Sequence, residues 1–167
     1  MNLITALAIV IGLLGGAATY VFIGPAAGLG LQIWATFIAW GSFFHSGGNE
    51  DALLKSLVGS VWGAICATVA LFALTKIGVS PINAGLAVAV SVVILILAAQ
   101  LPILGNIPAA VYGYASTAGF ALMGNHLGDL VSGGLGVNPL LTIVASFAIG
   151  GALGYVSGKI GGALAKK

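Results

Sequence analysis

Charged residues are what this sequence most lacks. Lysine and arginine together number 5, and aspartate and glutamate 3, so that 5% of 167 residues are charged, against about 25% in an ordinary soluble domain. Such a chain cannot cover its surface with polar groups, which excludes a soluble globular protein and makes lipid the expected solvent. The few lysines form no basic stripe, so nucleic acid is not an expected partner.

Cysteine and catalytic motifs are also scarce. Cys66 is the single cysteine and lies in an apolar run, which excludes a disulfide framework or a thiolate metal cluster within one chain. The sequence contains no G-x-S-x-G elbow, H-E-x-x-H motif or P-loop. We therefore expect no enzymatic activity, no cofactor and no bound metal.

What the sequence has instead is long apolar runs. Hydropathy and helix breakers divide the chain into six segments, each near the roughly 20 residues that cross a bilayer. The six segments cover about residues 2–23, 27–44, 52–74, 82–101, 108–123 and 139–160. The first lacks a basic n-region and a cleavage site, and we interpret it as a retained span. The expected fold is an all-α membrane protein, a single transmembrane domain of six helices over 1–167.

A faint internal repeat relates the two halves, about 1–78 and 79–167. The paired positions are Asn2 with Asn83, Gly24 with Gly105, Thr36 with Thr117, Leu53 with Leu140, Leu54 with Leu141, and Gly63 with Gly150. A unit of three spans ends on the opposite side of the membrane from its start, so the two three-helix repeats are expected to be inverted. Inverted repeats recur in transporters, where the solute site lies at the repeat interface near broken helices.

The lysines predict the orientation, because loops rich in Lys and Arg remain cytoplasmic. With six spans, both termini share one side with Lys55, Lys159, Lys166 and Lys167, and Lys76 lies opposite. Both termini are therefore expected in the cytoplasm.

No Asp, Glu or Arg lies well inside any predicted span. Transporters coupled to protons or sodium usually place an ionisable residue there, so passive conduction is favoured. Neutral hydrogen-bonding and aromatic side chains in the second and fifth spans are the candidate lining of a solute path. They are Gln32, Thr36, Trp40, Phe43, Phe44, Asn106, Tyr112, Ser116 and Thr117.

Each of these candidates has a simpler interpretation. Tryptophan and tyrosine are enriched at membrane interfaces as anchors, and serine and threonine often bond back to their own helix. Gln32 and Asn106 fit helix–helix bonding as well as solute contact. His45 and His126 are candidate gates, since histidine titrates near neutral pH, although a solvated polar rim would contain the same residues.

Glycines recur on one helical face in the third and sixth spans, where they allow close helix packing. These helix-packing candidates are Gly59, Gly63, Gly150, Gly154, Gly158 and Gly162. Packing within the chain is the simpler interpretation, and contact with another copy, as a homo-oligomer, is the other.

The pattern W-x-x-F-I-x-W-G-x-F-F-x-x-G-G from Trp34 to Gly48 is joined by "ALLKSLVGSVWGA" and "NIPAAVYGYASTAGFA". Over nearly its whole length the chain thereby resembles a family of small bacterial inner-membrane proteins known only as domain of unknown function 1097. The resemblance implies a multi-pass protein of the bacterial inner (plasma) membrane. It implies no activity and no functional residues.

The function expected from the residues is a passive channel or facilitator for a small uncharged or weakly charged polar solute, such as urea or a related amide. A structural or regulatory membrane subunit, binding a partner through its glycine-rich helix faces, is the alternative. A secondary transporter that holds ions on backbone carbonyls is a third interpretation, and an intramembrane enzyme has the least support.

Overall fold

The computed structural model describes residues 1–165, and within them every regular element is helical, which confirms the all-α class. Lys166 and Lys167, two of the residues that predict the orientation, lie outside the described residues. The α-helices are α1 (Leu3–Ile23), α2 (Ile33–His45), α3 (Glu50–Ile77), α4 (Pro81–Leu97), α5 (Ile107–Met123) and α6 (Pro139–Ala165). Short 3₁₀ turns are η1 (Ala27–Leu29), η2 (Ala98–Gln100), η3 (Pro102–Leu104) and η4 (Leu127–Asp129).

Polar side chains at the breaks start most of the helices. A side-chain oxygen accepts a bond from the backbone N–H three residues on at Asn2, Asn49, Ser80, Asn106 and Asn138. This satisfies one of the free N–H groups that open every helix. These residues also punctuate the apolar runs, which is why hydropathy places most helix starts within a few residues.

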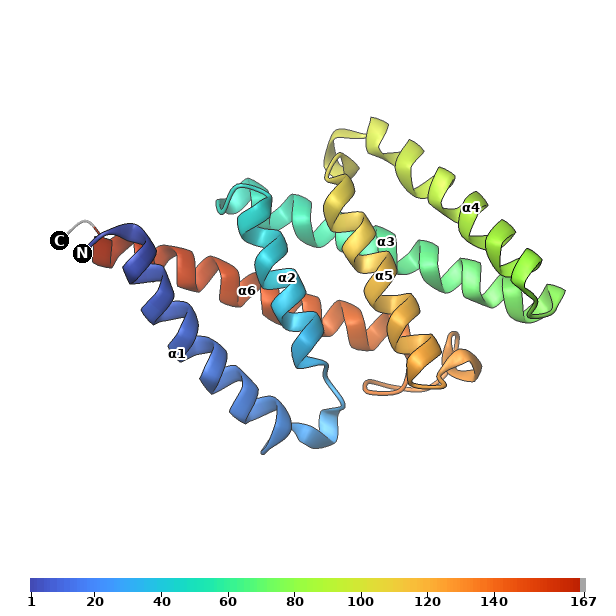
Figure 1. The fold of residues 1–167 in the computed structure, drawn as a ribbon, viewed down its shortest axis with the longest axis horizontal. Coiled ribbons are helices and arrows are strands. Elements are labelled where there is room, and N and C mark those ends of the chain that lie inside the picture. Colours follow the sequence, from blue (N-terminus) through green and yellow to red (C-terminus); the bar gives the residue numbers. More distant parts are fainter. Residues whose placement is uncertain (166–167) are drawn as a thin grey trace.

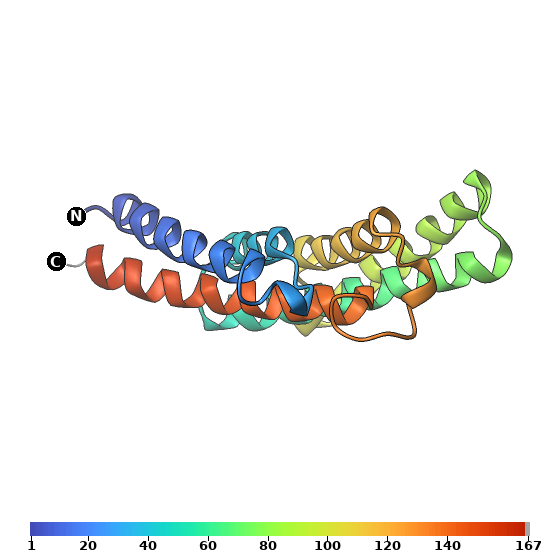
Figure 2. The same cartoon turned by 90° about the horizontal axis from the view of Figure 1, so that it is seen from below.

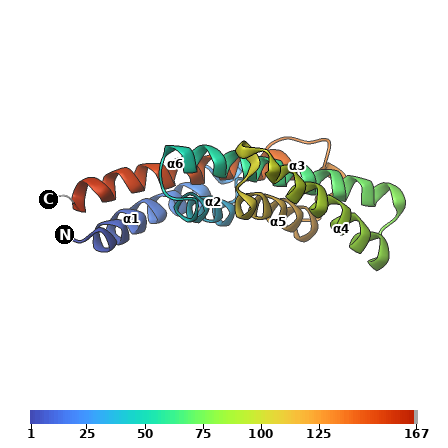
Figure 3. The ribbon, with the colours of Figure 1, turned by 90° about the horizontal axis from the view of Figure 1, so that it is seen from above.

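The helices lie in two layers. Figures 2 and 3 show α1, α2, α5 and α4 side by side in one layer, with the long helices α3 and α6 in the other. Figure 1 looks onto the first layer, where α2 and α5 lie at the centre and α1 and α4 at the two ends. The molecule is therefore a flat slab, with a broad face formed by the α2–α5 pair and its flanking helices.

Glycines bring α5 onto α3 and α2 onto α6. A Cβ at Gly63 of α3 would overlap the Ala110 carbonyl of α5, and one at Gly113 of α5 would overlap the Ser60 carbonyl of α3. On the other side, a Cβ at Gly150 of α6 would overlap the Thr36 carbonyl of α2. The backbones are thus in direct contact, as small residues permit in lipid.

Among the helical segments of residues 1–165, four are long and apolar enough to cross a membrane: Leu3–Ile23, Glu50–Ile77, Pro81–Gln100 and Pro139–Ala165. The other two are shorter. Helix α2 has 13 residues and α5 has 17, or about 20 and 26 Å at 1.5 Å per residue.

The expected start of the second span near residue 27 differs from the structure, where α2 begins at Ile33. Gly30 takes a left-handed conformation with φ of 64° and packs directly on Gly136. This contact with a distant loop bends the chain before α2, and hydropathy along the sequence contains no sign of it.

The centre of the slab is filled. A cluster of buried side chains from α2, α5 and α6 comprises Ala35, Ala39, Phe120, Ile143 and Phe147, with Ile38 and Tyr112 packed against it. Phe147 and Ile143 are at most 1% exposed. A path for a solute therefore has to follow the surface of this cluster rather than pass through it.

Candidate solute path along α2 and α5

Helices α2 and α5 run antiparallel beside each other in the layer that faces the viewer in Figure 1, and we call the line between them the α2–α5 seam. At one end, His45 Nδ1 lies 3.0 Å from the Tyr112 hydroxyl, and the Asn106 side-chain amide donates to Ser46 Oγ at 2.7 Å. The end of α2 is thereby fixed to the start of α5. Each end of the seam opens into a groove.

The first, the Gln32 groove, lies where α2 begins and α5 ends and has a volume of about 490 Å³. Its lining consists of Gln32, Trp34, Ile38, Ala115, Ser116, Gly119, Phe120, Met123 and Gly124. Gln32 is held in place, because its amide donates to the Gly30 carbonyl at 2.7 Å and its oxygen accepts from the Trp34 indole at 2.9 Å. The groove is mainly apolar and aromatic, with a few polar groups at one end.

The second, the Asn106 groove, lies at the opposite end of the seam and has a volume of about 380 Å³. It is lined by Ser46, Asp51, Lys55, Pro102, Gly105, Asn106 and Pro108. Asp51 and Lys55 pair at 2.7 Å and are both solvent-exposed. This groove is more polar than the first and carries its charges as a neutral pair.

Between the two grooves, the seam carries Gly41 of α2 and Tyr112 of α5, whereas Ala115 and Gly119 belong to the Gln32 groove. Gly41 and Ala115 are exposed, and a methyl group added at Gly41 or Gly119 would meet no atom of the described chain within 4 Å beyond its own turn. Tyr112 lies between the grooves and is half-buried, with its ring on the central cluster. We call the Gln32 groove, the Asn106 groove and the stretch with Gly41 and Tyr112 between them the trough; it has hydrogen-bonding groups at both ends.

The structure brings four of the nine lining candidates to this trough. Gln32 and Ser116 line one groove, Asn106 lines the other, and Tyr112 lies between them.

Four candidates on α2 lie elsewhere, in or beside the α2–α6 interface. Thr36 is 0% exposed and donates to the Ser146 carbonyl at 3.1 Å, and Trp40 is 3% exposed and donates from Nε1 to Ser157 Oγ at 2.9 Å. Phe43 packs on Gly154, and the half-buried Phe44 stacks edge-on against it. The four residues therefore lie away from the candidate path that they were predicted to line. The glycines of α6 leave room for this bulky face of α2, so it packs on α6.

The ninth candidate, Thr117, is 0% exposed, and its hydroxyl has no hydrogen-bond partner among the described residues. It lies on the buried side of α5, away from the residues that line the grooves.

The two gate candidates lie at opposite ends of the α2–α5 pair. His45 is exposed and bonds Tyr112. His126 stacks on Phe120, with ring centroids 4.8 Å apart, and its Nδ1 lies 3.2 Å from Asp129 Oδ2. Phe120 lines the Gln32 groove, so His126 lies just behind the groove wall.

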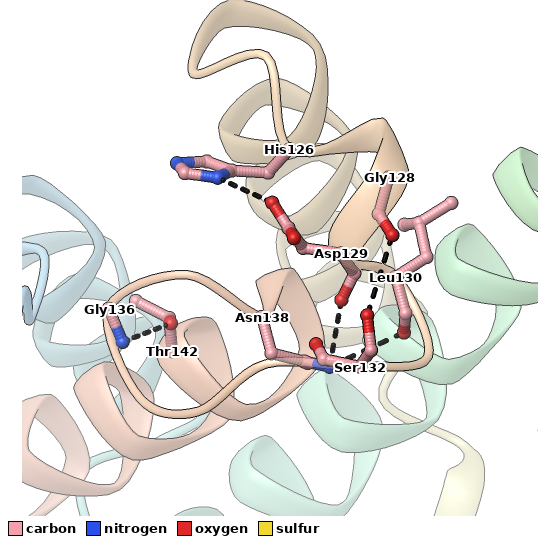
Figure 4. Close-up of polar contacts among 8 residues, drawn as sticks. All are labelled: His126, Gly128, Asp129, Leu130, Ser132, Gly136, Asn138 and Thr142. Carbon is pink, nitrogen blue, oxygen red and sulfur yellow. Dashed lines mark hydrogen bonds and ion pairs between the residues drawn. The ribbon is translucent and has the colours of Figure 1, made fainter.

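The loop that carries His126 is organised by Asn138, as Figure 4 shows. The Asn138 amide donates to the carbonyls of Asp129 and Ser132, each at 3.0 Å, and lies 3.4 Å from the carbonyl of Leu130. Gly136 N–H donates to Thr142 Oγ1 at 2.9 Å. The loop between α5 and α6 is thereby fixed to the start of α6, and its Gly136 packs on Gly30, shortly before the start of α2.

Five of the six packing glycines contact another helix. Gly59 and Gly63 face α5, whereas Gly150, Gly154 and Gly158 face α2. A Cβ at Gly162 would meet nothing within 4 Å in the described part of the chain.

A third groove, of about 490 Å³, lies between the start of α3 and α6. There the Tyr155 hydroxyl donates to Glu50 Oε1 at 2.9 Å, and Lys159 Nζ lies 3.4 Å from the same oxygen. Among residues 1–165, no three His, Cys, Asp or Glu side chains are grouped as metal ligands would be.

The sequence profile of a family described as "Protein of unknown function (DUF1097)" matches residues 8–162. The chain belongs to this family. No curated protein and no solved structure matches it significantly. Membership in DUF1097 confirms the resemblance seen in the Trp34–Gly48 pattern and assigns no activity, so functional inference rests on the geometry of the seam.

Sequence reasoning left several trough residues out of the predicted lining, chiefly Trp34, Ile38, Gly41, Ala115 and Gly119. Their signal is helical spacing: Trp34, Ile38 and Gly41 lie four and three residues apart on one face of α2, with His45 a turn further on. Spacing identifies which residues share a face, but it does not tell whether that face is buried or open.

Proposed function

We propose that this DUF1097 protein is a membrane-embedded facilitator through which a small, uncharged polar solute crosses passively along the α2–α5 seam. Urea and related amides are the solutes that fit best. The observation that carries the proposal is the pair of grooves at opposite ends of two antiparallel helices, with Gly41 and Tyr112 on the stretch between them.

The chemistry of the trough favours a neutral solute. Asp51 and Lys55 in the Asn106 groove form an ion pair and neutralise each other, and the stretch between the grooves carries Gly41 and Tyr112. A hydrated ion would lose its water there without compensating charge. A planar amide can stack on Trp34 and exchange hydrogen bonds with Ser116 in one groove and with Asn106 in the other, as solutes do with the lining groups of selective channels.

The proposal requires α2 and α5 to cross the membrane, giving six spans in total. Their lengths, about 20 and 26 Å, are short of a hydrocarbon core of roughly 30 Å. Grooves at both ends of the pair compensate for the short helices. Water that fills the grooves reduces the distance that a solute has to cross without contact with water. Non-helical backbone such as the approach to α2 is tolerated at membrane depth where it lines such a cavity.

An inverted repeat is part of the same proposal, and two features support it. A half-turn about the line of sight of Figure 1 brings α1, α2 and α3 close to the positions of α4, α5 and α6. The glycine contacts correspond as well, since Gly63 with Ala110 repeats the contact of Gly150 with Thr36.

This correspondence aligns Thr36 with Ala110, two helical turns from its predicted match, Thr117. It also pairs Trp40 with Tyr114 and Ser42 with Ser116.

The alternative of a structural subunit has less support. The glycine face of α6 that would receive a partner is covered by α2 over Gly150 and Gly154. Open glycines remain on α1, at Gly12 and Gly16.

Purified protein in liposomes tests the proposal by stopped-flow swelling with urea, formamide, glycerol and acetate. We expect protein-dependent permeability to urea and formamide, less to the larger glycerol, and none to the acetate anion. Urea permeability that equals that of empty liposomes would refute the proposal. Permeability that appears only with a sodium or proton gradient would instead identify a coupled transporter.

A further inference from the structure

The groove between the start of α3 and α6 takes no part in the proposed solute path, and we call it the Glu50 groove. It has a volume of about 490 Å³ and is lined by Gly48, Asn49, Glu50, Asp51, Tyr155, Gly158 and Lys159. Only Asp51 among these residues also lines a groove of the α2–α5 seam. What the Glu50 groove binds is therefore independent of whether a solute crosses along the seam.

The Glu50 groove lies at an edge of the slab where several helices begin or end. Figure 1 shows the starts of α3 and α5 and the ends of α2 and α6 along the same upper edge of the molecule. The first turns of α3 carry Glu50, Asp51 and Lys55, and the helix then carries no charge until Lys76. This edge therefore lies at the level of the lipid headgroups, and the groove opens among them.

The structure shows how the groove receives a primary ammonium group. The ammonium of Lys159 lies 3.4 Å from Glu50 Oε1 and 5.1 Å from the centre of the Tyr155 ring. The Tyr155 hydroxyl donates to the same carboxylate oxygen at 2.9 Å and fixes its position. A carboxylate and an aromatic ring thus bind a cation together.

The pair of Glu50 and Lys159 is loose and can exchange partners. Their side chains keep 75% and 64% of their surface exposed, and such exposed pairs add little stability. A separation of 3.4 Å is also long for a charge-assisted hydrogen bond, which usually measures about 2.7–2.9 Å. Within residues 1–165, Glu50 Oε2 and the side-chain N–H groups of Asn49 form no hydrogen bond. The groove therefore has an acceptor and several donors to offer a ligand.

We propose that the Glu50 groove binds a phospholipid whose headgroup carries a primary ammonium and a phosphodiester, as ethanolamine lipids do. The ligand ammonium donates to Glu50 beside the Tyr155 ring, in the place that Lys159 Nζ now takes. Lys159 turns to the phosphate, which also accepts from the Asn49 amide.

The charges of the groove select this headgroup. Glu50 and Lys159 supply one charge of each sign, and Asp51 is neutralised by Lys55 at 2.7 Å. A headgroup with a phosphate and no ammonium would place uncompensated negative charge against Glu50. A choline headgroup has no N–H group and cannot donate to Glu50. The primary ammonium is therefore the feature that the groove recognises.

An aromatic ring beside the charged groups favours a lipid over a soluble ester of ethanolamine. A Cβ added at Gly48 would lie 3.6 Å from Phe44 Cδ1, and one added at Gly158 would lie 3.8 Å from Phe44 Cε1. Phe44 is half-buried, and the two glycines leave its ring uncovered on these sides. The glycerol and the first methylene groups of a lipid can pack there.

Native mass spectrometry of the purified protein tests the site. The protein in detergent is mixed with equal amounts of phosphatidylethanolamine and phosphatidylcholine that have the same acyl chains, so only the N–H donors of the headgroup differ. We expect one retained ethanolamine lipid per chain, preferred by about tenfold, because a hydrogen bond from a charged group contributes at least that factor. Equal retention of the two lipids, or stronger retention of phosphatidylglycerol, would overturn the inference. This comparison uses the unaltered protein and does not depend on the folding of a variant.

Two pairs of variants locate the lipid. Glu50→Gln should remove the preference for the ethanolamine lipid, whereas Asp129→Asn, at a paired carboxylate in the loop after α5, should keep it. Lys159→Gln should weaken lipid retention, whereas Lys55→Gln, at a lysine that lines the Asn106 groove, should not. An unchanged preference in Glu50→Gln, or unchanged retention in Lys159→Gln, would place the lipid elsewhere and overturn the inference.

A soluble competitor distinguishes the lipid from its headgroup. Glycerophosphoethanolamine has the same charged groups without acyl chains, and we expect it to displace the bound lipid only at large excess. Displacement at concentrations equal to that of the lipid would identify a soluble ester as the ligand and overturn the assignment to a phospholipid.

Discussion

Replacing Gly63 by alanine tests the close contact between α3 and α5. A Cβ at Gly63 would overlap the Ala110 carbonyl and lie 2.7 Å from the Ala110 carbonyl carbon and 2.8 Å from the Tyr114 nitrogen. All three are backbone atoms of α5, so no side chain can rotate away and the whole helix has to shift. Overpacking of this kind typically costs about 1–3 kcal/mol.

Gly16→Ala is the matched control. Gly16 lies on α1, where an added methyl group would meet nothing within 4 Å in the described chain. In an open helix position alanine is favoured over glycine by up to about 1 kcal/mol. The two variants carry the same chemical change, so the helix-propensity gain of alanine cancels between them and the unfolding free energies should differ by the overpacking cost, about 1–3 kcal/mol in favour of Gly16→Ala.

The assay is reversible unfolding in mixed detergent micelles, followed by tryptophan fluorescence, and Trp62 adjoins the altered position. Destabilisation by Gly63→Ala with a neutral or stabilising effect of Gly16→Ala is the expected result. Equal effects of the two substitutions would show that α3 and α5 are not in backbone contact, and the packing described here would be refuted.

Three further predictions concern other parts of the molecule. Trp40→Phe removes the buried hydrogen bond to Ser157 and should lower the unfolding free energy by about 0.6–1.7 kcal/mol. Urea permeability should not change, and a loss of permeability with unchanged stability would place Trp40 on the path. Asn138→Ala removes the three carbonyl contacts of the loop before α6 and should make this loop the first site of limited proteolysis. An unchanged cleavage pattern would show that Asn138 does not hold the loop in place. Thiols introduced by Gly28→Cys and Asp51→Cys should be labelled from opposite sides of the membrane, and labelling from the same side would show that α2 does not cross.

The helical class and most helix starts were predictable because each depends on local sequence. Apolar runs of the required length mark the helices, and asparagine or serine at the breaks provides the caps, as at Asn49 and Ser80. The start of α2 was not predictable in this way. It depends on the contact between Gly30 and Gly136, which are far apart in the sequence.

The candidate site was predictable only in part, for a similar reason. Helical spacing puts the lining candidates Thr36, Trp40 and Phe43 on one face of α2, and in the structure this face packs on α6. Which face is open depends on where the glycines of α6 admit the neighbouring helix. On α5, the face of Ser116 and Gly119 is the one that lines the trough.

The most direct test of the central claim is urea permeability of liposomes that contain Gly119→Leu. The added side chain has space at this position and would fill the trough between Ser116 and Trp34. Gly12→Leu, at an equally open position on α1, is the control. The seam account predicts that Gly119→Leu abolishes urea flux while the protein stays folded and Gly12→Leu retains it. Full flux through Gly119→Leu would contradict a solute path along α2 and α5.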